Sequence, residues 1–284
     1  MEACHSETIA QGERFSFGDN WARFLSCLND DRIAEAENSL KVMLNLSDLS
    51  GKSFLDIGCG SGLFSLAARR LGAVVHSFDY DPQSVACARE LKRRFFPDDK
   101  LWTIQEGSAL DEGYIDNLGQ YDVVYSWGVL HHTGDMMRGL VNAHKPVKQD
   151  GLLFIAIYND QGFASRFWTK VKKTYCSGMF GRYLVSAAFI PVFALTSIGL
   201  GMIKHGSPMG HFASYKRKRG MSLYHDWIDW LGGYPFEVAK PETVFLFYKA
   251  LGFRLLNLST TNRLGCNQFV FQRERLLDTP VGKG

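Results

Sequence analysis

The sequence predicts an α/β protein built on a doubly wound, mostly parallel seven-stranded sheet. From Gly51 to Tyr158, short apolar runs alternate with stretches of helical periodicity, which is the pattern of repeated βα units. The same alternation returns after Pro241 and supplies the last helix and two strands. With 284 residues, 46% apolar and 21% charged, the chain can bury a full core without disulfides or metals, so disorder is excluded for most of it.

The individual elements follow from the apolar pattern and from turn residues. A helix is expected to begin at Pro82, because the fixed φ and missing N–H of proline suit the first helical turn. The last helix begins at Pro241 and ends at Gly252. Segment 20–46 is expected to be a helix whose apolar stripe caps the sheet. The expected strands cover 53–57, 73–79, 101–105, 121–126, 152–158, 253–259 and 267–273.

These elements divide the chain into a core and a large insertion. Roughly 80 residues separate the fifth strand from the last helix, far more than an ordinary loop, and such an insertion usually covers a site. The predicted division is a helical cap at 1–50, a ligand-binding core at 51–160, an insertion at 161–240, the closing helix and strands at 241–275, and a tail at 276–284.

A glycine-rich loop directly after the first strand marks the expected ligand site. Residues 55–62 read Leu-Asp-Ile-Gly-Cys-Gly-Ser-Gly, and their glycines let the backbone turn sharply and approach a ligand closely. Asp79 lies about twenty residues further on, at the end of the second strand, where a carboxylate can hold two ribose hydroxyls. The pair predicts a nucleoside ligand, and a tight turn without a ligand is the alternative.

This loop and three later segments together resemble the class I S-adenosylmethionine-dependent methyltransferases. Leu-Asp-Ile-Gly-Cys-Gly-Ser-Gly matches that family's first motif, and Ser-Phe-Asp-Tyr-Asp-Pro (77–82) matches its acidic second-strand motif. Residues 106–111 stand where the family contacts adenine, and 121–132 where its fourth strand ends beside the methionine moiety. The resemblance implies a Rossmann-like fold. The donor half resembles the subgroup that includes the ubiquinone-pathway O-methyltransferases, whereas the insertion does not match that subgroup.

The resemblance implies S-adenosylmethionine as the cofactor and S-adenosylhomocysteine as the product. The glycine-loop residues would surround the methionine portion and the ribose, with Asp79 on the ribose hydroxyls and Ser126 at the amino-acid end. Ser108 and Ala109 would line the adenine edge, and Tyr80 would stack on the base. No reactive role is expected for the cysteine of the loop. The implied donor-binding residues are Asp56, Gly58, Cys59, Gly60, Asp79, Tyr80, Ser108, Ala109 and Ser126.

Two histidines after the fourth strand are candidates for the chemistry. Methyl transfer is an in-line displacement, so the protein aligns donor and acceptor and, for a hydroxyl acceptor, removes a proton. His131 and His132 follow the strand at the sheet edge where open α/β sheets bind ligands. In similar small-molecule methyltransferases the first of these positions faces the acceptor, so His131 is the predicted general base. A structural histidine that caps a turn is the alternative, and it is favoured for His132.

The insertion carries a second polar and aromatic cluster at 224–237. His225 with Asp226 or Asp229 would form an oriented base, and the aromatic side chains would wall an apolar acceptor pocket. A packed helix and turn is the alternative. Ser126 stands where metal-dependent relatives need a carboxylate, so no metal site is expected. The predicted acceptor-binding residues are Phe17, Trp21, Trp127, His132, Tyr158, Trp227, Trp230 and Tyr234.

An uncharged run at 184–203 has the length of a membrane span. A single crossing would separate strands of one sheet, and Pro191 interrupts the helix, so we expect two short helices. They are either buried in the insertion or lie in a membrane interface, where flanking basic residues would hold an anionic surface. Those residues would otherwise be solvated or bind an anionic acceptor group; they are Lys170, Lys172, Lys173, Arg182, Lys204 and 216–219.

Composition narrows the classes of function. A net charge of +3 is too small to predict nucleic-acid binding. The chain also lacks the Asn-Pro-Pro-Tyr or Asp-Pro-Pro-Tyr tetrapeptide of methyltransferases that act on DNA amines, and the Pro-Cys pair of those that attack pyrimidine carbon 5, so DNA is not an expected partner. Six scattered cysteines and an N-terminus without a signal pattern favour a cytoplasmic protein, peripheral on the inner membrane face if the apolar run meets lipid.

The sequence therefore predicts a methyltransferase that acts on a small or lipid-like acceptor, by in-line O-methylation with a histidine base. A methyltransferase for protein or RNA, a small-molecule N-, S- or C-methyltransferase, and a non-catalytic S-adenosylmethionine-binding module stay open as alternatives.

Overall fold

The structure, a computed structural model, describes residues 28–207 and 223–275, together with residues 8, 9, 11, 12, 15 and 25. Two predicted acceptor residues, Phe17 and Trp21, and the basic segment 216–219 lie outside the described residues.

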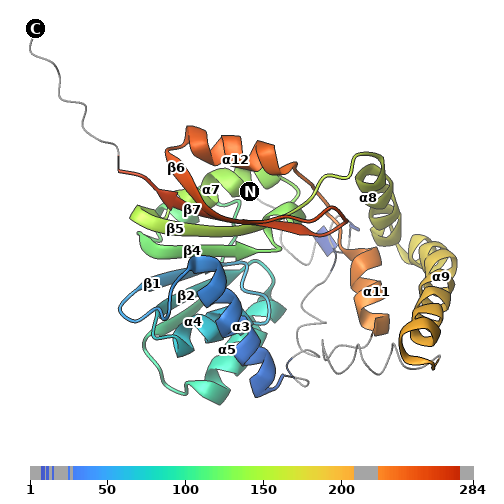
Figure 1. The fold of residues 1–284 in the computed structure, drawn as a ribbon, viewed down its shortest axis with the longest axis horizontal. Helices are drawn as coiled ribbons and strands as arrows, with labels where there is room; N and C mark the ends of the chain where they lie inside the picture. Colours follow the sequence, from blue (N-terminus) through green and yellow to red (C-terminus); the bar gives the residue numbers. More distant parts are fainter. Residues whose placement is uncertain are drawn as a thin grey trace, which may run out of the picture.

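A seven-stranded sheet forms the centre of the molecule, with helices on both faces (Figure 1). The strand order is β3-β2-β1-β4-β5-β7-β6. The first five strands in this order are parallel, and β7 runs antiparallel to both β5 and β6. This architecture confirms the predicted doubly wound, mostly parallel sheet. The strands are β1 (Ser53–Ile57), β2 (Val74–Asp79), β3 (Trp102–Glu106), β4 (Tyr121–Trp127), β5 (Val147–Tyr158), β6 (Phe253–Ser259) and β7 (Cys266–Arg273).

The start of β5 was predicted five residues too late, whereas the other predicted strand starts agree with the structure to within one residue. The strand begins at Val147 instead of residue 152, because Val147 pairs with Tyr121 at the start of β4. A register shift after Tyr121 accommodates the extra residues, and Asp150 takes a positive φ of 61° there. Polar residues in this bulged part hide the strand pattern in the sequence.

Two apolar layers hold helices against the sheet. Phe54 of β1 points into the layer under α3, α4 and α5, whereas its neighbour Leu55 points into the layer under α6, α7 and α12. This alternation is what a strand buried on both faces requires. The helices are α3 (Asp30–Leu44), α4 (Leu63–Arg70), α5 (Pro82–Phe95), α6 (Glu112–Asp116), α7 (Met136–His144) and α12 (Pro241–Ala250).

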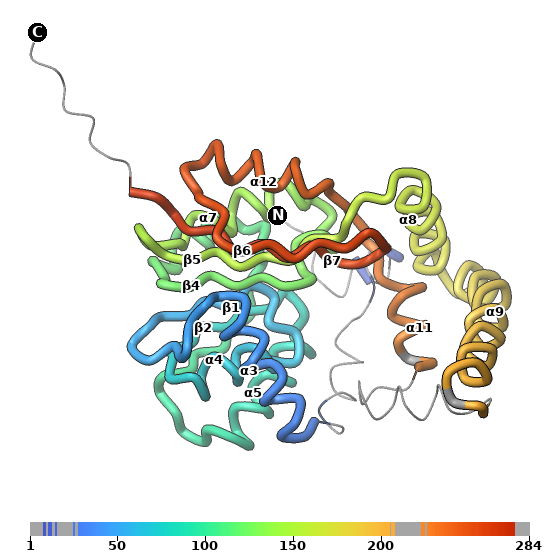
Figure 2. The backbone as a smooth tube through the Cα atoms, viewed as in Figure 1, coloured from blue at the N-terminus to red at the C-terminus, as the bar shows by residue number. Residues whose placement is uncertain are grey.

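Three helices of the insertion pack against one another beside the sheet: α8 (Phe163–Cys176), α9 (Met179–His205) and α11 (Leu223–Gly232) (Figures 1 and 2). The prediction of two short helices at 184–203 is wrong, since α9 continues through Pro191. Pro191 and Ala187, the residue whose carbonyl loses its helical partner, are both exposed, so the interruption lies on the solvent side of the helix.

Candidate active site

The glycine loop is fastened to the end of β2 by its own backbone. The amides of Gly58 and Cys59 both donate to the Phe78 carbonyl, at 2.9 and 3.0 Å. The amide of Gly60 donates to Asp79 Oδ2 at 2.8 Å. A phosphate-binding loop needs such amides free for the anion. Because these amides already donate hydrogen bonds within the protein, the loop is a poor pyrophosphate site. It remains suited to a nucleoside without phosphates.

Two carboxylates border the loop. Asp79 accepts the amides of Gly60 and Asp81, at 2.8 and 2.9 Å, which fixes its carboxylate beside the loop. Asp56 at the end of β1 is only 2% exposed. Burial raises its pKa to about 7 against a hydrogen bond from Ser65, and the charge of Asp79 raises it further. Two neighbouring carboxylates favour a cationic ligand, which fits the sulfonium and amino groups of S-adenosylmethionine.

A buried hydrogen-bond chain fixes Asp56 from behind. The Trp102 indole donates to Ser77 Oγ at 2.9 Å, and Ser77 donates to Ser65 Oγ at 2.7 Å. Ser65 in turn donates to Asp56 Oδ2 at 2.5 Å. Sequence reasoning missed both serines. The available signal was their position as polar residues inside otherwise apolar segments.

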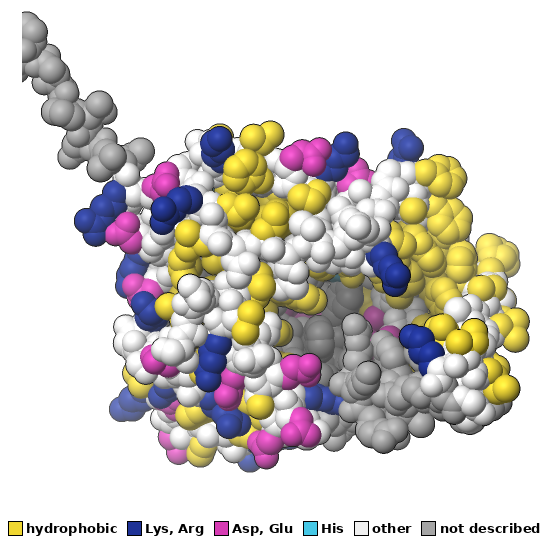
Figure 3. Space-filling view, viewed as in Figure 1, with side chains coloured by type: hydrophobic (Ala, Val, Ile, Leu, Met, Phe, Trp, Pro, Cys, Tyr) yellow, Lys and Arg dark blue, Asp and Glu magenta, His cyan; other side chains and the backbone are white. Residues whose placement is uncertain are grey.

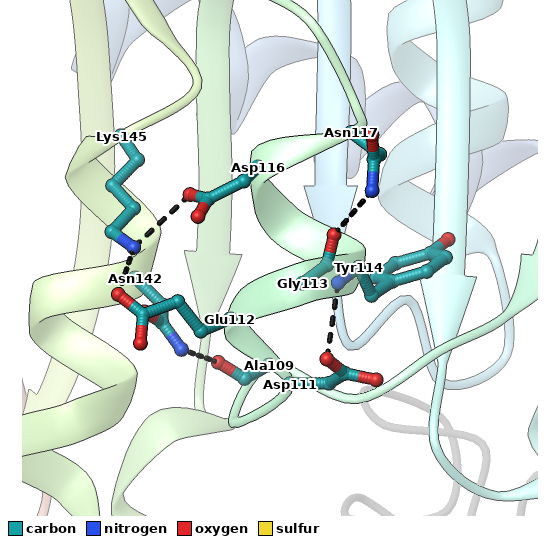
Figure 4. A network of polar contacts seen from close by, with 9 residues as sticks. All are labelled: Ala109, Asp111, Glu112, Gly113, Tyr114, Asp116, Asn117, Asn142 and Lys145. Atoms are coloured by element: carbon teal, nitrogen blue, oxygen red, sulfur yellow. Dashed lines mark hydrogen bonds and ion pairs between the residues drawn. The ribbon is translucent and has the colours of Figure 1, made fainter.

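The segment predicted to line the adenine edge is held by α6 and α7 (Figure 4). Asn142 Nδ2 donates to the Ala109 carbonyl at 2.9 Å, and Asp111 caps α6 by accepting the Tyr114 amide at 3.0 Å. Tyr114, which the sequence analysis did not single out, packs edge-on against Phe78 at 5.1 Å. Its ring also lies over Gly107, where a Cβ would come within 2.5 Å of it. Tyr114 therefore forms a wall beside the predicted adenine position.

Two predicted residues at the end of β4 have structural partners. Ser126 is fully buried, and its hydroxyl donates to the Ile57 carbonyl at 3.0 Å, which links β4 to β1. Trp127 is 42% exposed and donates to Gln268 at 3.2 Å. Roles of these side chains toward donor or acceptor stay predictions.

The geometry of His131 is the reverse of the one that a general base needs. It lies in a short 3-10 turn (Leu130–His132) and is fully buried. Its Nδ1 accepts the Tyr158 amide at 3.3 Å, so the neutral ring carries its proton on Nε2. Burial lowers the pKa of His131 well below its usual range, with further contributions from His132 and Lys172. In this state the ring can donate a hydrogen bond from Nε2, and neither nitrogen is placed to accept a proton.

The Nε2 atom of His131 has no hydrogen-bond partner within the described residues. Buried donors in proteins are nearly always paired, and an orphan of this kind calls for a ligand or water. The atom therefore marks a place where an oxygen of a bound molecule would be stabilised.

Aromatic rings continue from His131 into the insertion, and we call this set the aromatic wall. His131 lies 4.2 Å from Tyr158 between ring centroids, and Tyr158 lies 5.0 Å from Phe236 and 6.3 Å from Trp230. Trp230 contacts Trp168 of α8 at 5.2 Å. Of the predicted acceptor residues, Tyr158, Trp230 and His132 thus come together, since the His132 ring lies 5.6 Å from that of Tyr158. Trp227 instead contacts Phe193 of α9 at 5.9 Å.

Lys172 lies inside the aromatic wall, although the sequence analysis placed it among the flanking basic residues. It is 1% exposed, and its ammonium lies 4.2 Å from the Trp230 ring centroid and 4.9 Å from that of Phe236. It also donates to the Trp230 carbonyl. Burial lowers its pKa to about 7, against the charges of Cys176 and Asp229. The signal in the sequence was its helical spacing, four residues after Trp168 and three before Tyr175.

The segment 233–239 closes this region. The amide of Glu237 donates to the His131 carbonyl at 2.9 Å, and its carboxylate accepts the amides of Gly134 and Met136. His132 Nδ1 lies 2.5 Å from the Pro235 carbonyl. A Cβ on Gly233 would lie 3.4 Å from both His132 Cε1 and Lys172 Nζ, so the two groups converge there.

Other predicted residues are less informative. Nothing is described of the His225 side chain, so its pairing with Asp226 or Asp229 stays a prediction.

A surface hollow of about 530 Å³ lies beside Lys92, Lys100 and the start of β3. Strands start at the edge opposite the glycine loop, so this hollow is not the donor site.

Comparison with known proteins decides the family. The model of the family described as "Methyltransferase domain" matches residues 23–200, well over half of the chain. The chain belongs to this methyltransferase family. The methyltransferase uses S-adenosylmethionine as its cofactor, in agreement with the glycine loop and the two carboxylates.

Curated relatives match only part of their length. The ubiquinone biosynthesis O-methyltransferase of Pseudomonas paraeruginosa is 31% identical over 118 residues, which cover 39% of this chain and 46% of the relative. The ribosomal protein L11 methyltransferase of Methylococcus capsulatus is 42% identical over 69 residues, 24% of each chain. The methyltransferase thus spans less than half the length of these relatives in the matched regions.

Solved structures share the fold. Magnesium protoporphyrin IX methyltransferase from Synechocystis PCC 6803 with bound S-adenosylhomocysteine has a TM-score of 0.55 at 13% identity, covering 94% of this chain and 100% of the other. An O-methyltransferase family protein from Burkholderia thailandensis has a TM-score of 0.52 at 13% identity, covering 86% of this chain and 58% of the other.

Proposed function

We propose that the methyltransferase methylates an oxygen of a small, apolar or lipid-like molecule. The observation that carries this proposal is the aromatic wall, which joins the turn after β4 to the helices of the insertion. Apolar and aromatic linings with a few polar groups are typical of small-molecule sites. The similarity of the donor half to ubiquinone biosynthesis O-methyltransferases supports the same acceptor class.

The polar groups of the wall have complementary roles in this proposal. When bound, S-adenosylmethionine supplies the methyl group. His131 would hold the acceptor oxygen through its Nε2–H, the donor that lacks a partner among the described residues. Lys172, with a pKa of about 7, is partly neutral at physiological pH and would accept the hydroxyl proton. This assignment replaces the predicted histidine base with a lysine, because Nδ1 of His131 is already an acceptor.

Transfer of a deuterated methyl group tests the proposal. The protein is incubated with deuterated S-adenosylmethionine and a cell extract, which is then separated into an organic-solvent extract, aqueous metabolites, protein and RNA. We expect label in the organic-solvent extract, and much less label with an Asp79→Ala control at the same low donor concentration. Label confined to protein or RNA would assign the macromolecular alternative. Donor binding without label in any fraction would identify a non-catalytic module.

A further inference from the structure

The outer surface of the insertion is unusually apolar. By length and composition, α9 from Met179 to Lys204 is long and apolar enough to cross a membrane, and only 17% of its most apolar stretch is buried. Among the large hydrophobic side chains of α8 and α9, the most exposed are Phe163 (77%), Met179 (75%), Phe180 (82%), Tyr183 (69%), Leu195 (69%) and Ile203 (83%). We call these residues and the surface between them the α8–α9 face. Hydrophobic side chains gather there in the space-filling view (Figure 3).

The inner side of α9 packs against the other helices of the insertion. Phe189 and Phe193 of α9 contact Trp168 of α8, at 5.4 and 6.4 Å, and Phe193 also contacts Trp227 of α11. The outer side contains no charged residue from Tyr183 to Ile203. Soluble monomers rarely expose a continuous apolar surface of this extent, so the face calls for a partner.

The fold rules out that α9 crosses a membrane, but it allows α9 to lie along a membrane surface. The strand β5 precedes the insertion and β7 follows it, and the two pair along their lengths from Leu152 to Tyr158. Both ends of the insertion therefore belong to one sheet. A helix of 27 residues is about 40 Å long, and α9 packs along α8 and α11, so its outer side can lie flat on a bilayer.

The charge of the insertion indicates which kind of partner surface its apolar face would bind. Residues 161–225 contain ten of the 32 Lys and Arg and none of the 29 Asp and Glu, so the rest of the chain has a net charge of −7. Among the described members, Arg166, Lys170, Lys173, Arg182 and Lys204 are exposed on α8 and α9. Basic residues around an apolar face are attracted to anionic lipid headgroups. A second copy of the same face would bring like charges together, which disfavours self-association.

We propose that the α8–α9 face docks the protein on an anionic membrane, with α9 lying in the interface. The aromatic wall contacts the inner side of α9 at Phe189, directly behind this face, and runs from there through Trp168 and Trp230 to Tyr158 and His131. An apolar acceptor would reach the catalytic region along it. This last step rests on the proposed function, whereas the docking itself does not.

Vesicle co-sedimentation of the full chain tests the docking. We expect the wild type to bind vesicles of phosphatidylcholine with 30% phosphatidylserine, to bind pure phosphatidylcholine at least tenfold less, and to weaken in high salt. The double variant Leu195→Glu/Ile203→Glu should lose at least tenfold in binding. Leu246→Glu is the matched control, since Leu246 is 57% exposed on α12, away from this face.

Folding and function are measured separately. Calorimetry with S-adenosylmethionine and the thermal midpoint should be unchanged in the double variant. A wild type that binds neither vesicle, or a double variant that binds like the wild type, would overturn the docking. So would a dimer that the double variant converts to a monomer without any vesicle binding. Vesicle binding without methylation of any lipid-soluble molecule would leave the docking standing and remove the proposed function.

Discussion

Replacing Lys172 by methionine should change how stability depends on pH. The folded protein lowers the pKa of Lys172 from 10.5 to about 7 through burial. Between these values the folded protein binds fewer protons than the unfolded chain, so this group makes stability rise with pH. The loss of unfolding free energy from burying the Lys172 ammonium is largest at and below pH 7, and this loss becomes smaller as the pH approaches 10.5.

The size of the effect follows from the same shift. One pKa unit corresponds to about 1.4 kcal/mol, so raising the pH from 7 to 9 should stabilise the wild type by about 2 kcal/mol through Lys172. Lys172→Met lacks this contribution. Buried thiols such as Cys59 and Cys266 also titrate with pH, but they are present in both proteins and cancel in the difference.

Urea unfolding at pH 7 and pH 9 measures this difference directly. The stability of Lys172→Met relative to the wild type should fall by about 2 kcal/mol between the two pH values. Lys173→Met, an exposed lysine of the same helix, should show no such change. Equal differences at both pH values for Lys172→Met would refute a buried lysine whose pKa is lowered to about 7. In activity assays the wild-type rate should rise through about pH 7, and this rise should be lost together with most of the turnover in Lys172→Met.

The remaining predictions concern the donor loop and His131. Asp79→Ala should weaken donor binding by tenfold or more in calorimetry, because it removes the acceptor of charged hydrogen bonds; unchanged affinity would reject the ribose assignment. His131→Ala should lower turnover about tenfold to a hundredfold without changing donor affinity or the rise near pH 7, and a lost rise would restore the histidine base. Gly58→Ala should cost about 2 kcal/mol or more in urea unfolding, because φ is 76° and the new Cβ would lie 2.3 Å from Val129; Gly119→Ala, with φ 81° and open space, should cost less.

The sheet and the donor loop could be predicted because their signals are local. A strand such as Ser53–Ile57 followed by glycines and a helix is readable within a dozen residues, and the structure keeps that order. The orientation of His131 could not be predicted in this way. It depends on the amide of Tyr158, 27 residues later, and on Glu237, which approaches from the far end of the insertion. Contacts between segments so far apart leave no periodic trace in the sequence.

Helix α8 shows why the basic residues of the insertion could not be treated as one group. Trp168, Lys172 and Tyr175 are spaced by four and three residues and face inward, whereas Phe167, Lys170 and Lys173 face solvent. In the sequence of this helix, lysines alternate with apolar residues in the same way on the buried side and on the exposed side. Only the position of each lysine on the helical wheel separates the buried Lys172 from the exposed lysines. One amphipathic helix therefore carries the lysine proposed for proton transfer on its inner side and part of the proposed membrane face on its outer side, so lipid contact and acceptor entry are adjacent in this fold.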